Sequence, residues 1–270
     1  MKKKNFLVVP IIIAVVVIIW ILFLKKEKGQ QIKDYPQIEK SGVLHIVTDY
    51  NSIGYFVSGD TIAGFNHDLI QLIETYIPIK IEVSLESGLE KSIEDLKKGR
   101  YDVVARNIPI TTLLRDSLKF TEPIVQNRQV LIQRKKSYND NTEPIRSHLD
   151  LAKKTIYISA KSPAKLRLEN LSHEIGDTIY IKEDQVYGSE QLAMLVASKE
   201  IDYAVCDEKT AENVAKGLPE IDYATFIGFT HLEAWAVREQ SPILLDSLNT
   251  WIQHLKKTDA YKKIYSKYYK

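Results

Sequence analysis

Residues 92–105 read SIEDLKKGRYDVVA, and residues 192–206 repeat their pattern as LAMLVASKEIDYAVC. In both stretches, apolar residues at helical spacing are followed by a polar turn, an Asp and a short apolar run. Such spacing predicts an amphipathic helix, and the short apolar run predicts a buried strand of a parallel sheet. A helix that leads into a parallel strand is half of a βαβ unit, so the repeat predicts an α/β chain built from two such units.

The rest of the chain extends this pattern into two halves, each with the order strand, helix, strand, helix, strand. One helix begins at Ser162-Pro163, an N-cap residue followed by Pro at the first helical position. The expected strands are 43–47, 79–85, 101–105, 155–159, 178–181 and 202–206, and the other expected helices are 66–77, 89–96 and 188–198. The apolar stretches 129–132 and 234–237 fit neither half and predict a pair of hinge strands, and helices from Ser241 and over 261–268 complete the chain.

The composition is that of a folded protein with an uneven charge distribution. Of 270 residues, 44% are hydrophobic and 27% are charged, which excludes a mainly disordered chain and a multi-span channel. Residues 29–270 carry 31 basic and 34 acidic side chains, which excludes the basic surface that nucleic-acid binding requires. Cys206 is the only cysteine, so an intrachain disulfide and a Cys-rich metal site are excluded. The six His residues lack metal-ligand spacing, and we expect neither a metal nor a cofactor.

The N-terminal segment is expected to be a membrane anchor. Asn5–Leu24 contains no charged residue, which matches the length of about 20 residues that crosses a bilayer as a helix. A cleaved signal peptide is the alternative, but its apolar region is shorter and ends in small residues, whereas this run ends at Phe23-Leu24 and Lys25-Lys26. We therefore assign 1–24 as an uncleaved anchor and the polar residues 25–41 as a tether, with the folded part beginning near Gly42.

Polar residues follow the expected strands at the edge where ligands bind in open parallel sheets. Arg106 could grip a carboxylate with two hydrogen bonds, the helix end at Ser162 could support the same group, and Asp207 could hold an ammonium. Each has a structural alternative, because Arg106 could pair with Glu122 or Asp102, Ser162 could cap its helix without any ligand, and Asp207 could only cap the following helix. The predicted ligand-binding residues from the first strand and its loop are Asp49, Tyr50, Tyr55 and Phe56, of which the three aromatic residues could instead be core or rim.

Several motifs resemble family 3 of the bacterial solute-binding proteins, the amino-acid type of periplasmic binding protein. Gly64-Phe65-Asn66-His67-Asp68-Leu69, Leu96 to Asp102, Lys119 to Pro123, Asp202 to Asp207 and Ile252–Tyr268 match its signatures in order and spacing. The resemblance implies the type II periplasmic-binding-protein fold, with two lobes joined by two hinge strands and a small ligand between them. It also implies an extracytoplasmic location. The lobes would be 42–130 plus 233–270 and 131–232.

One departure from the family concerns the residue that grips the ligand carboxylate. The family uses a T-x-x-R motif for this purpose, and Thr112-Leu113-Leu114-Arg115 has that pattern. It lies one residue closer to Phe120 than the family spacing requires, so either one residue is missing here or Leu114 stands at the clamp position, and Arg106 is a substitute candidate. Asp207 alone matches the acidic residue that takes the α-amino group. A free α-amino acid is therefore the expected type of ligand, with Arg115 or Arg106 as its carboxylate partner.

Three functions remain in competition. The first is a membrane-anchored binding protein, not an enzyme, that captures an amino acid or similar zwitterion for an ABC-type transporter and its membrane permease. The second is a sensor or cell-wall-fragment receptor without a transport role, since the same binding lobe stands at the front of membrane-bound lytic transglycosylase F. The third is an enzyme on this scaffold, such as a dehydratase, for which Asp49 and Glu208 would be the acid and base.

Overall fold

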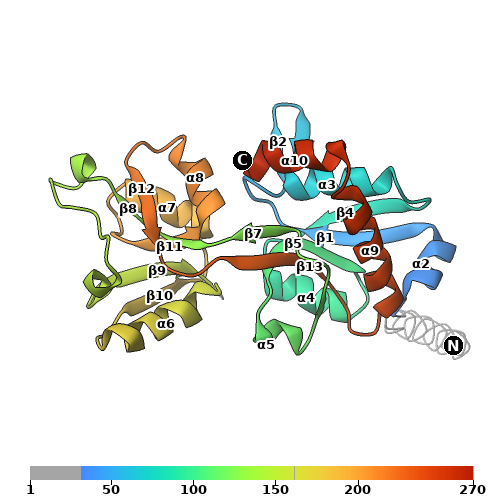
Figure 1. Ribbon diagram of the computed structural model, residues 1–270, viewed down its shortest axis with the longest axis horizontal. Helices are drawn as coiled ribbons and strands as arrows, with labels where there is room; N and C mark the ends of the chain where they lie inside the picture. The colour runs from blue at the N-terminus through green and yellow to red at the C-terminus, as the bar shows by residue number, and fades with distance from the viewer. Residues whose placement is uncertain (1–31, 161, 270) are drawn as a thin grey trace, which may run out of the picture.

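The computed structural model describes residues 32–160 and 162–269, and it consists of two α/β lobes with one central sheet each (Figure 1). We call the lobe around the sheet of order β4-β1-β5-β13-β6 the first lobe, and β7 also pairs with β13 there. The second lobe surrounds the sheet of order β10-β9-β11-β8-β12. The chain enters the second lobe after β7 and returns to the first lobe at β13.

The first lobe combines parallel and antiparallel strands. β1 pairs in parallel with β4 and β5, whereas β13 is antiparallel to β5, β6 and β7. The strands are β1 (Val43–Thr48), β2 (Phe56–Ser58), β3 (Thr61–Ala63), β4 (Lys80–Leu85), β5 (Val103–Pro109), β6 (Lys119–Phe120), β7 (Val125–Asn127) and β13 (His231–Val237). The helices are α2 (Tyr35–Ser41), α3 (Phe65–Glu74), α4 (Leu89–Lys97), α5 (Thr112–Arg115), α9 (Pro242–Leu255) and α10 (Asp259–Tyr269).

The second lobe has the same mixed character. β9 pairs in parallel with β10 and β11, and β8 lies antiparallel between β11 and β12. Its strands are β8 (Gln129–Arg134), β9 (Thr155–Ser159), β10 (Tyr180–Asp184), β11 (Ala204–Asp207) and β12 (Ile221–Phe226). Its helices are α6 (Ala164–Ile175), α7 (Ser189–Ala197) and α8 (Glu208–Ala215), with the 3₁₀ turns η1 (Lys136–Tyr138) and η2 (His148–Leu151).

The repeated pattern of the sequence is confirmed in both lobes. α4 leads into β5 and α7 leads toward β11, and each of these strands pairs in parallel with the first strand of its half. The first three residues of β5 and of β11 are apolar and buried, because each strand lies inside its sheet. The expectation of purely parallel sheets is wrong, because the chain segments that cross between the lobes add antiparallel strands to both.

The expected pairing of the two hinge stretches is also wrong. Residues 129–132 belong to β8 in the second lobe, and residues 234–237 belong to β13 in the first lobe. Each lies between two strands of its own sheet, which explains why both are apolar on both faces. The crossings are the single residue Arg128 between β7 and β8, and residues 227–230 between β12 and β13.

The end of the predicted tether is folded rather than extended. Tyr35–Ser41 forms α2, with Asp34 as its N-cap in a capping box and Ile38 fully buried. The Asp34 carboxylate also accepts hydrogen bonds from the backbone N–H groups of Ile243 and Leu244 at the start of α9. The short polar sequence of α2 has no helical period that reveals the helix, and its contact with α9 joins parts of the chain that are distant in sequence.

The predicted membrane anchor, residues 5–24, lies outside the described residues. Across 32–160 and 162–269, none of the helices combines the length and the apolar character that crossing a bilayer requires. The anchor therefore stays a prediction from the sequence.

Candidate functional site

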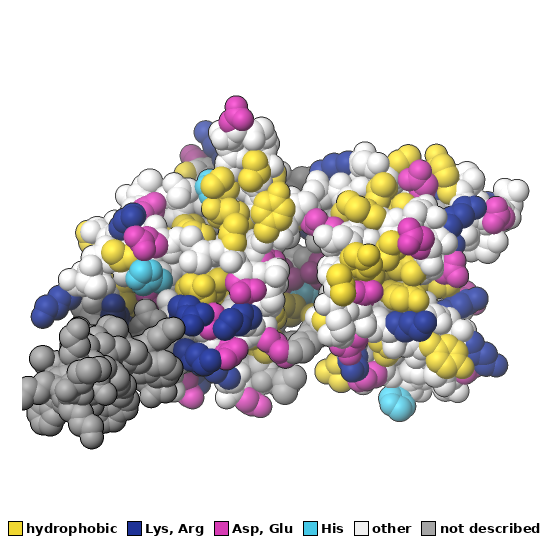
Figure 2. Space-filling view, turned by 180° about the vertical axis from the view of Figure 1, so that it is seen from behind, with side chains coloured by type: hydrophobic (Ala, Val, Ile, Leu, Met, Phe, Trp, Pro, Cys, Tyr) yellow, Lys and Arg dark blue, Asp and Glu magenta, His cyan; other side chains and the backbone are white. Residues whose placement is uncertain are grey.

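The two lobes face each other across a hollow in the molecular surface (Figure 2). The segment after β1 spans it, since the Ser52 N–H donates to Glu190 Oε1 at 2.9 Å and Asn213 Nδ2 donates to the Ser52 carbonyl at 3.3 Å. Glu190 lies in the first turn of α7 and Asn213 lies in α8, both in the second lobe. The ends of β1, β5 and β11 are therefore the natural place to look for ligand-binding side chains.

Asp49 and Arg106 come together at the ends of the neighbouring parallel strands β1 and β5. Arg106 Nη2 lies 3.1 Å from Asp49 Oδ2, and the guanidinium also donates to the carbonyls of Glu86 and Ser87. The other oxygen, Asp49 Oδ1, is buried and has no hydrogen-bond partner among the described residues. Arg106 thus pairs with neither Glu122 nor Asp102, and its charge is already balanced within the first lobe.

Asp207 lies at the crossing between the lobes, beside two residues of β13. His231 Nε2 is 3.9 Å from Asp207 Oδ1 and 3.2 Å from Glu233 Oε1. Asp207 is the N-cap residue of α8, but its side chain makes no cap hydrogen bond, so capping does not account for it. Glu233 is fully buried, whereas 37% of the Asp207 side chain is exposed. The sequence analysis identified Asp207 and missed both partners.

The Asp207 and Glu233 carboxyls are costly to ionise together. Burial raises the pKa of Glu233 to about 8, an effect that a hydrogen bond from Asn127 opposes. The pKa of Asp207 is raised to about 7, first by its desolvated position and then by the charge of Glu233, and the His231 imidazole opposes this. A positively charged group at this point would relieve the repulsion between the two carboxylates.

A second ion pair fixes the crossing itself. Arg128 is the crossing residue after β7, and its Nε and Nη2 atoms each donate to the Glu208 carboxylate at 2.7 Å. Glu208 is therefore held by a bidentate salt bridge at the start of α8. Its proposed partnership with Asp49 as an acid and base pair is not realised here, because each carboxylate is paired with a different arginine.

Ser162 lies next to the start of α6, one residue earlier than expected. The helix begins at Ala164, Pro163 occupies the N-cap position, and Ser162 Oγ accepts the Ala164 N–H at 3.2 Å. The serine hydroxyl therefore stabilises the helix end, as its structural alternative predicted.

The three aromatic candidates do not form one lid. Tyr50 is largely exposed, whereas Tyr55 packs edge-on against His67 with ring centroids 5.3 Å apart. Phe56 begins β2, which forms a small hairpin with β3 beside the first lobe. Only Tyr50 and Tyr55 flank the segment that reaches the second lobe through Ser52.

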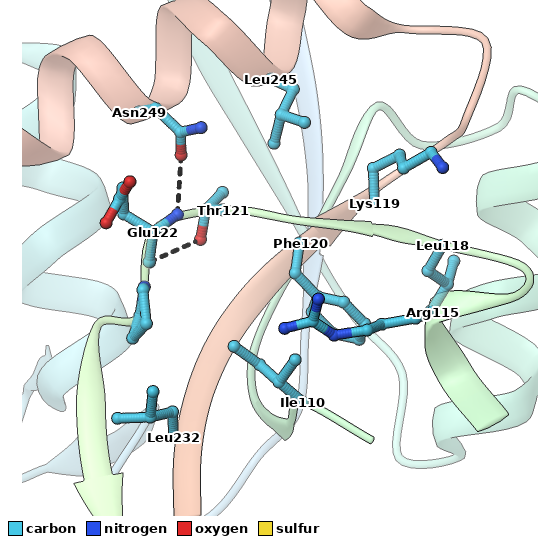
Figure 3. Close-up of a pocket in the computed structure, with 11 residues that line it drawn as sticks. Ile110, Arg115, Leu118, Lys119, Phe120, Thr121, Glu122, Leu232, Leu245 and Asn249 are labelled. Carbon is cyan, nitrogen blue, oxygen red and sulfur yellow. Dashed lines mark hydrogen bonds between the residues drawn. The ribbon is translucent and has the colours of Figure 1, made fainter. Parts of the chain in front are cut away.

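Arg115 occupies a different pocket, of about 350 Å³, in the first lobe. Figure 3 shows its side chain extending from α5 toward Ile110 and Phe120, with Leu232, Leu245 and Asn249 on the other side. Asn249 Oδ1 accepts the Glu122 N–H at 2.7 Å at one end of this pocket. Asp49, Arg106 and Asp207 do not line it. Leu232, which lies between His231 and Glu233 on β13, lines the same pocket, so Arg115 lies near this strand but in a pocket that Asp49, Arg106 and Asp207 do not share.

His231 and Glu233 are the site residues that the sequence analysis missed. They alternate along β13, whose sequence is HLEAWAV, so both side chains lie on one face of an otherwise apolar strand. A buried Glu inside an apolar strand is expensive unless it has a partner or a ligand, and that is the signal that could have found them. Arg128 was missed because nothing in the local sequence marks it as the crossing residue.

Comparison with known families gives one match that covers most of the chain. The model of the bacterial extracellular solute-binding proteins, family 3, matches residues 43–270. Among curated relatives, the membrane-bound lytic murein transglycosylase F of Desulfosudis oleivorans is 26% identical over 86% of this chain and 50% of its own length. That of Shewanella sediminis is 22% identical over 91% of this chain and 50% of its own length. The chain thus spans about half the length of the curated relatives it matches.

Solved structures with a similar fold include amino-acid-binding proteins. An ancestral amino acid-binding protein, a precursor of cyclohexadienyl dehydratase, superposes with a TM-score of 0.75 at 22% identity, covering 87% of this chain and 99% of that one. An ancestral arginine-binding protein bound to arginine gives a TM-score of 0.73 at 22% identity, covering 85% and 99% of the two chains. At this identity the likeness establishes the α/β periplasmic-binding-protein fold and leaves the ligand to the residues of the site.

Proposed function

Because the chain belongs to family 3 of the bacterial extracellular solute-binding proteins, we propose that it captures a small solute with a positively charged group between its two lobes. The main candidate is an amino acid or a similar zwitterion. Its ammonium group would bind at Asp207, where the crossing strands meet the second lobe.

The observation that carries this proposal is the surplus of carboxylates at the crossing. Asp49 and Glu208 are each paired with an arginine, whereas Asp207 and Glu233 share His231 as their ion-pair partner among the described residues. An ammonium group that binds Asp207 would offset the repulsion between the carboxylates and would donate charged hydrogen bonds to Asp207. A ligand that carries only negative charge would add to the repulsion.

The carboxylate end of a zwitterion would bind Arg106 in the same proposal. Its guanidinium group lies at the end of β5 and already contacts Asp49 and two backbone carbonyls. The ligand carboxylate would share these donors with Asp49, at a cost that lowers the affinity for the zwitterion. An amine or a cationic amino acid would gain more binding free energy from the carboxylates of Asp207 and Glu233. It is therefore expected to bind better than a neutral amino acid.

Delivery to a transporter is the proposed role of this binding, with a membrane permease as the partner and the N-terminal segment as the anchor outside the cytoplasm. A second candidate is the recognition of cell-wall fragments by a receptor without a transport role. It is favoured by the relatives named as murein transglycosylases, although this chain spans about half of their length. In both candidates the lobes bind without converting their ligand, and a dehydratase-like activity is a third, weaker one.

A thermal-shift screen of the purified full chain separates these candidates. The screen would contain the common amino acids, small amines and soluble peptidoglycan fragments, in buffer with a chelator. A true ligand at a hundredfold excess over its dissociation constant is expected to stabilise the chain by about 2.7 kcal/mol. Stabilisation by an amino acid or amine supports the main proposal, and stabilisation by peptidoglycan fragments alone supports the second.

The matched controls are two substitutions of aspartate by asparagine. Asp207→Asn is expected to remove the shift, whereas Asp246→Asn, on the exposed face of α9, is expected to keep it. If no compound changes the melting temperature of the wild type, the binding proposal fails. If a ligand is consumed by the wild type, the enzyme candidate replaces it.

A further inference from the structure

We propose that Asp207, His231 and Glu233 form a binding site for a divalent transition-metal ion such as Zn²⁺. These residues each offer one ligand atom, and the three atoms lie within 4.8 Å of one another. One imidazole nitrogen and two carboxylate oxygens are ligands that Zn²⁺ accepts, and three protein ligands leave a fourth position open. The proposal goes beyond solute capture, because it assigns the site an inorganic ligand.

The distances from His231 to the two carboxylates are near those of a metal site. Metal–ligand bonds of about 2.0–2.2 Å at tetrahedral angles place neighbouring ligand atoms roughly 3.4 Å apart. The His231 nitrogen lies 3.2 Å from Glu233 Oε1 and 3.9 Å from Asp207 Oδ1, on both sides of this value. Small rotations of partly exposed side chains would complete the geometry, since 23% of His231 and 37% of Asp207 are exposed.

An unpartnered oxygen is the second, independent observation. Glu233 is fully buried, and its Oε2 atom has no hydrogen-bond partner among the described residues. Buried oxygens without donors are costly in a folded protein, and a bound cation is one way to satisfy them.

A metal ion at this point would join the two lobes. Asp207 ends β11 in the second lobe, whereas His231 and Glu233 belong to β13 in the first lobe. No metal-ligand spacing is visible in the sequence, because the ligands come from two strands that are separated in the chain. A bound ion would therefore favour the arrangement of the lobes in which these strands meet.

The ion and the ammonium of a solute would exclude each other at Asp207, because both need the same carboxylate. This makes the two proposals separable. Zinc binding is measured without amino acids or amines, and the solute screen is run with a chelator. Failure of either measurement leaves the other proposal standing.

The test is a calorimetric titration of the untagged full chain with Zn²⁺, with Mg²⁺ as the hard-cation comparison. We expect one Zn²⁺ per chain and much weaker binding of Mg²⁺, which avoids imidazole. His231→Ala should weaken Zn²⁺ binding by more than about a hundredfold, because even the loss of outer partners of a metal site costs 10–100-fold. Glu233→Gln, which keeps the size of the side chain, should also weaken Zn²⁺ binding.

The control is His173→Ala, which removes a histidine from the last turn of α6, in the second lobe. This variant should bind Zn²⁺ as the wild type does. Wild-type affinity in His231→Ala, or an equal loss in His173→Ala, would refute the site. Circular dichroism of each variant before titration checks that the fold is intact, and His231→Ala is the variant that decides, because its side chain is partly exposed.

Discussion

At the scale of single residues, the buried ion pair between Arg238 and Asp102 shows how one side chain joins distant segments. Arg238 Nη2 lies 3.0 Å from Asp102 Oδ1, and both residues are buried. The same guanidinium donates to the carbonyls of Lys33 and Leu96, and Asp102 Oδ2 accepts the His45 N–H. Asp102 is therefore a structural residue that fixes the start of β5, and it is not available to Arg106.

Removal of the Arg238 side chain should therefore lower the stability of the protein strongly. Arg238→Ala would leave the Asp102 carboxylate buried without its cation, and we expect a loss of about 3–5 kcal/mol in the free energy of unfolding. Urea denaturation followed by circular dichroism measures this loss. Lys119→Ala removes the exposed partner of Glu239 and should cost less than about 1 kcal/mol. Similar losses in the two variants would contradict the structural role of the buried pair.

At the scale of elements, the last helix is fastened to the start of α3. Asp68 Oδ2 accepts hydrogen bonds from Tyr268 Oη at 2.7 Å and from Lys267 Nζ at 3.0 Å, and Asp68 Oδ1 lies 2.9 Å from His67 Nδ1. The Gly64 N–H donates to the Tyr268 hydroxyl, and the Phe65 ring packs edge-on against Tyr269. The sequence around Gly64 and the C-terminal tyrosines thus form one interface.

The pKa of Asp68 makes this interface sensitive to acid. Burial acts to raise the pKa, but hydrogen bonds from His67, Tyr268 and Lys267 outweigh it, so the pKa lies below its usual value of 3.8. A lowered pKa contributes stability above 3.8 that is lost as the pH falls through the folded-state value. Asp68→Asn should therefore be destabilised by about 1–2 kcal/mol at pH 6, and the difference from the wild type should shrink at pH 2.5.

Melting temperatures of the two proteins between pH 6 and pH 2.5 test this expectation. Asp259→Asn is the control on α10, the helix that Asp68 contacts, because the Asp259 side chain is 87% exposed and pairs only with the neighbouring Lys262 in the described structure. Its difference from the wild type should stay small at every pH. A pH-independent difference in melting temperature between Asp68→Asn and the wild type would show that the charge of the Asp68 carboxylate does not contribute to stability.

The elements also show how far the sequence predicts the fold. The two helix-to-strand repeats were predictable, because β5 and β11 each begin with three consecutive apolar residues that are buried. α2 was not, because a helix of seven residues with one fully buried side chain has no detectable period. Its stability comes from Asp34, which also accepts hydrogen bonds from the start of α9. Local sequence carries no trace of that contact.

The candidate site also contains residues that the sequence predicts and residues that it does not. Asp207 was predictable because it directly follows a buried strand, and the structure places it at the crossing. The pairing of Asp49 with Arg106 follows from β1 and β5 being neighbours, a fact of sheet order that the sequence does not state. His231 and Glu233 reach Asp207 only because β13 returns from the second lobe to the first. Their role depends on topology, which single-sequence periodicity does not determine.

At the scale of the whole molecule, two lobes that each have their own core meet through few direct contacts. Their cores are separate groups of buried side chains, and the lobes share the crossings at Arg128 and 227–230. The contact of Ser52 with Glu190 and Asn213 is made away from these crossings, by side chains of α7 and α8. A hinge motion about the crossings would therefore break this contact first.

Loss of the Glu190 carboxylate should release the lobes. The hydrogen bond from the Ser52 N–H to Glu190 Oε1 involves a charged acceptor, and such a bond contributes about 1.5–3 kcal/mol, which corresponds to a ten- to hundredfold change in the ratio of closed to open molecules. In Glu190→Ala, the distance between spin labels at Asp60→Cys and Glu169→Cys should lengthen and its distribution should broaden.

These label positions lie in different lobes and are exposed, whereas the native Cys206 is buried and reacts slowly. Pulsed electron paramagnetic resonance measures this distance, and Glu200→Ala, which removes an exposed carboxylate bonded within the second lobe to Ser198, should leave it as in the wild type. An unchanged distribution in Glu190→Ala would mean that the crossings alone hold the lobes together, and the Ser52 contact would then be a consequence of closure rather than one of its causes.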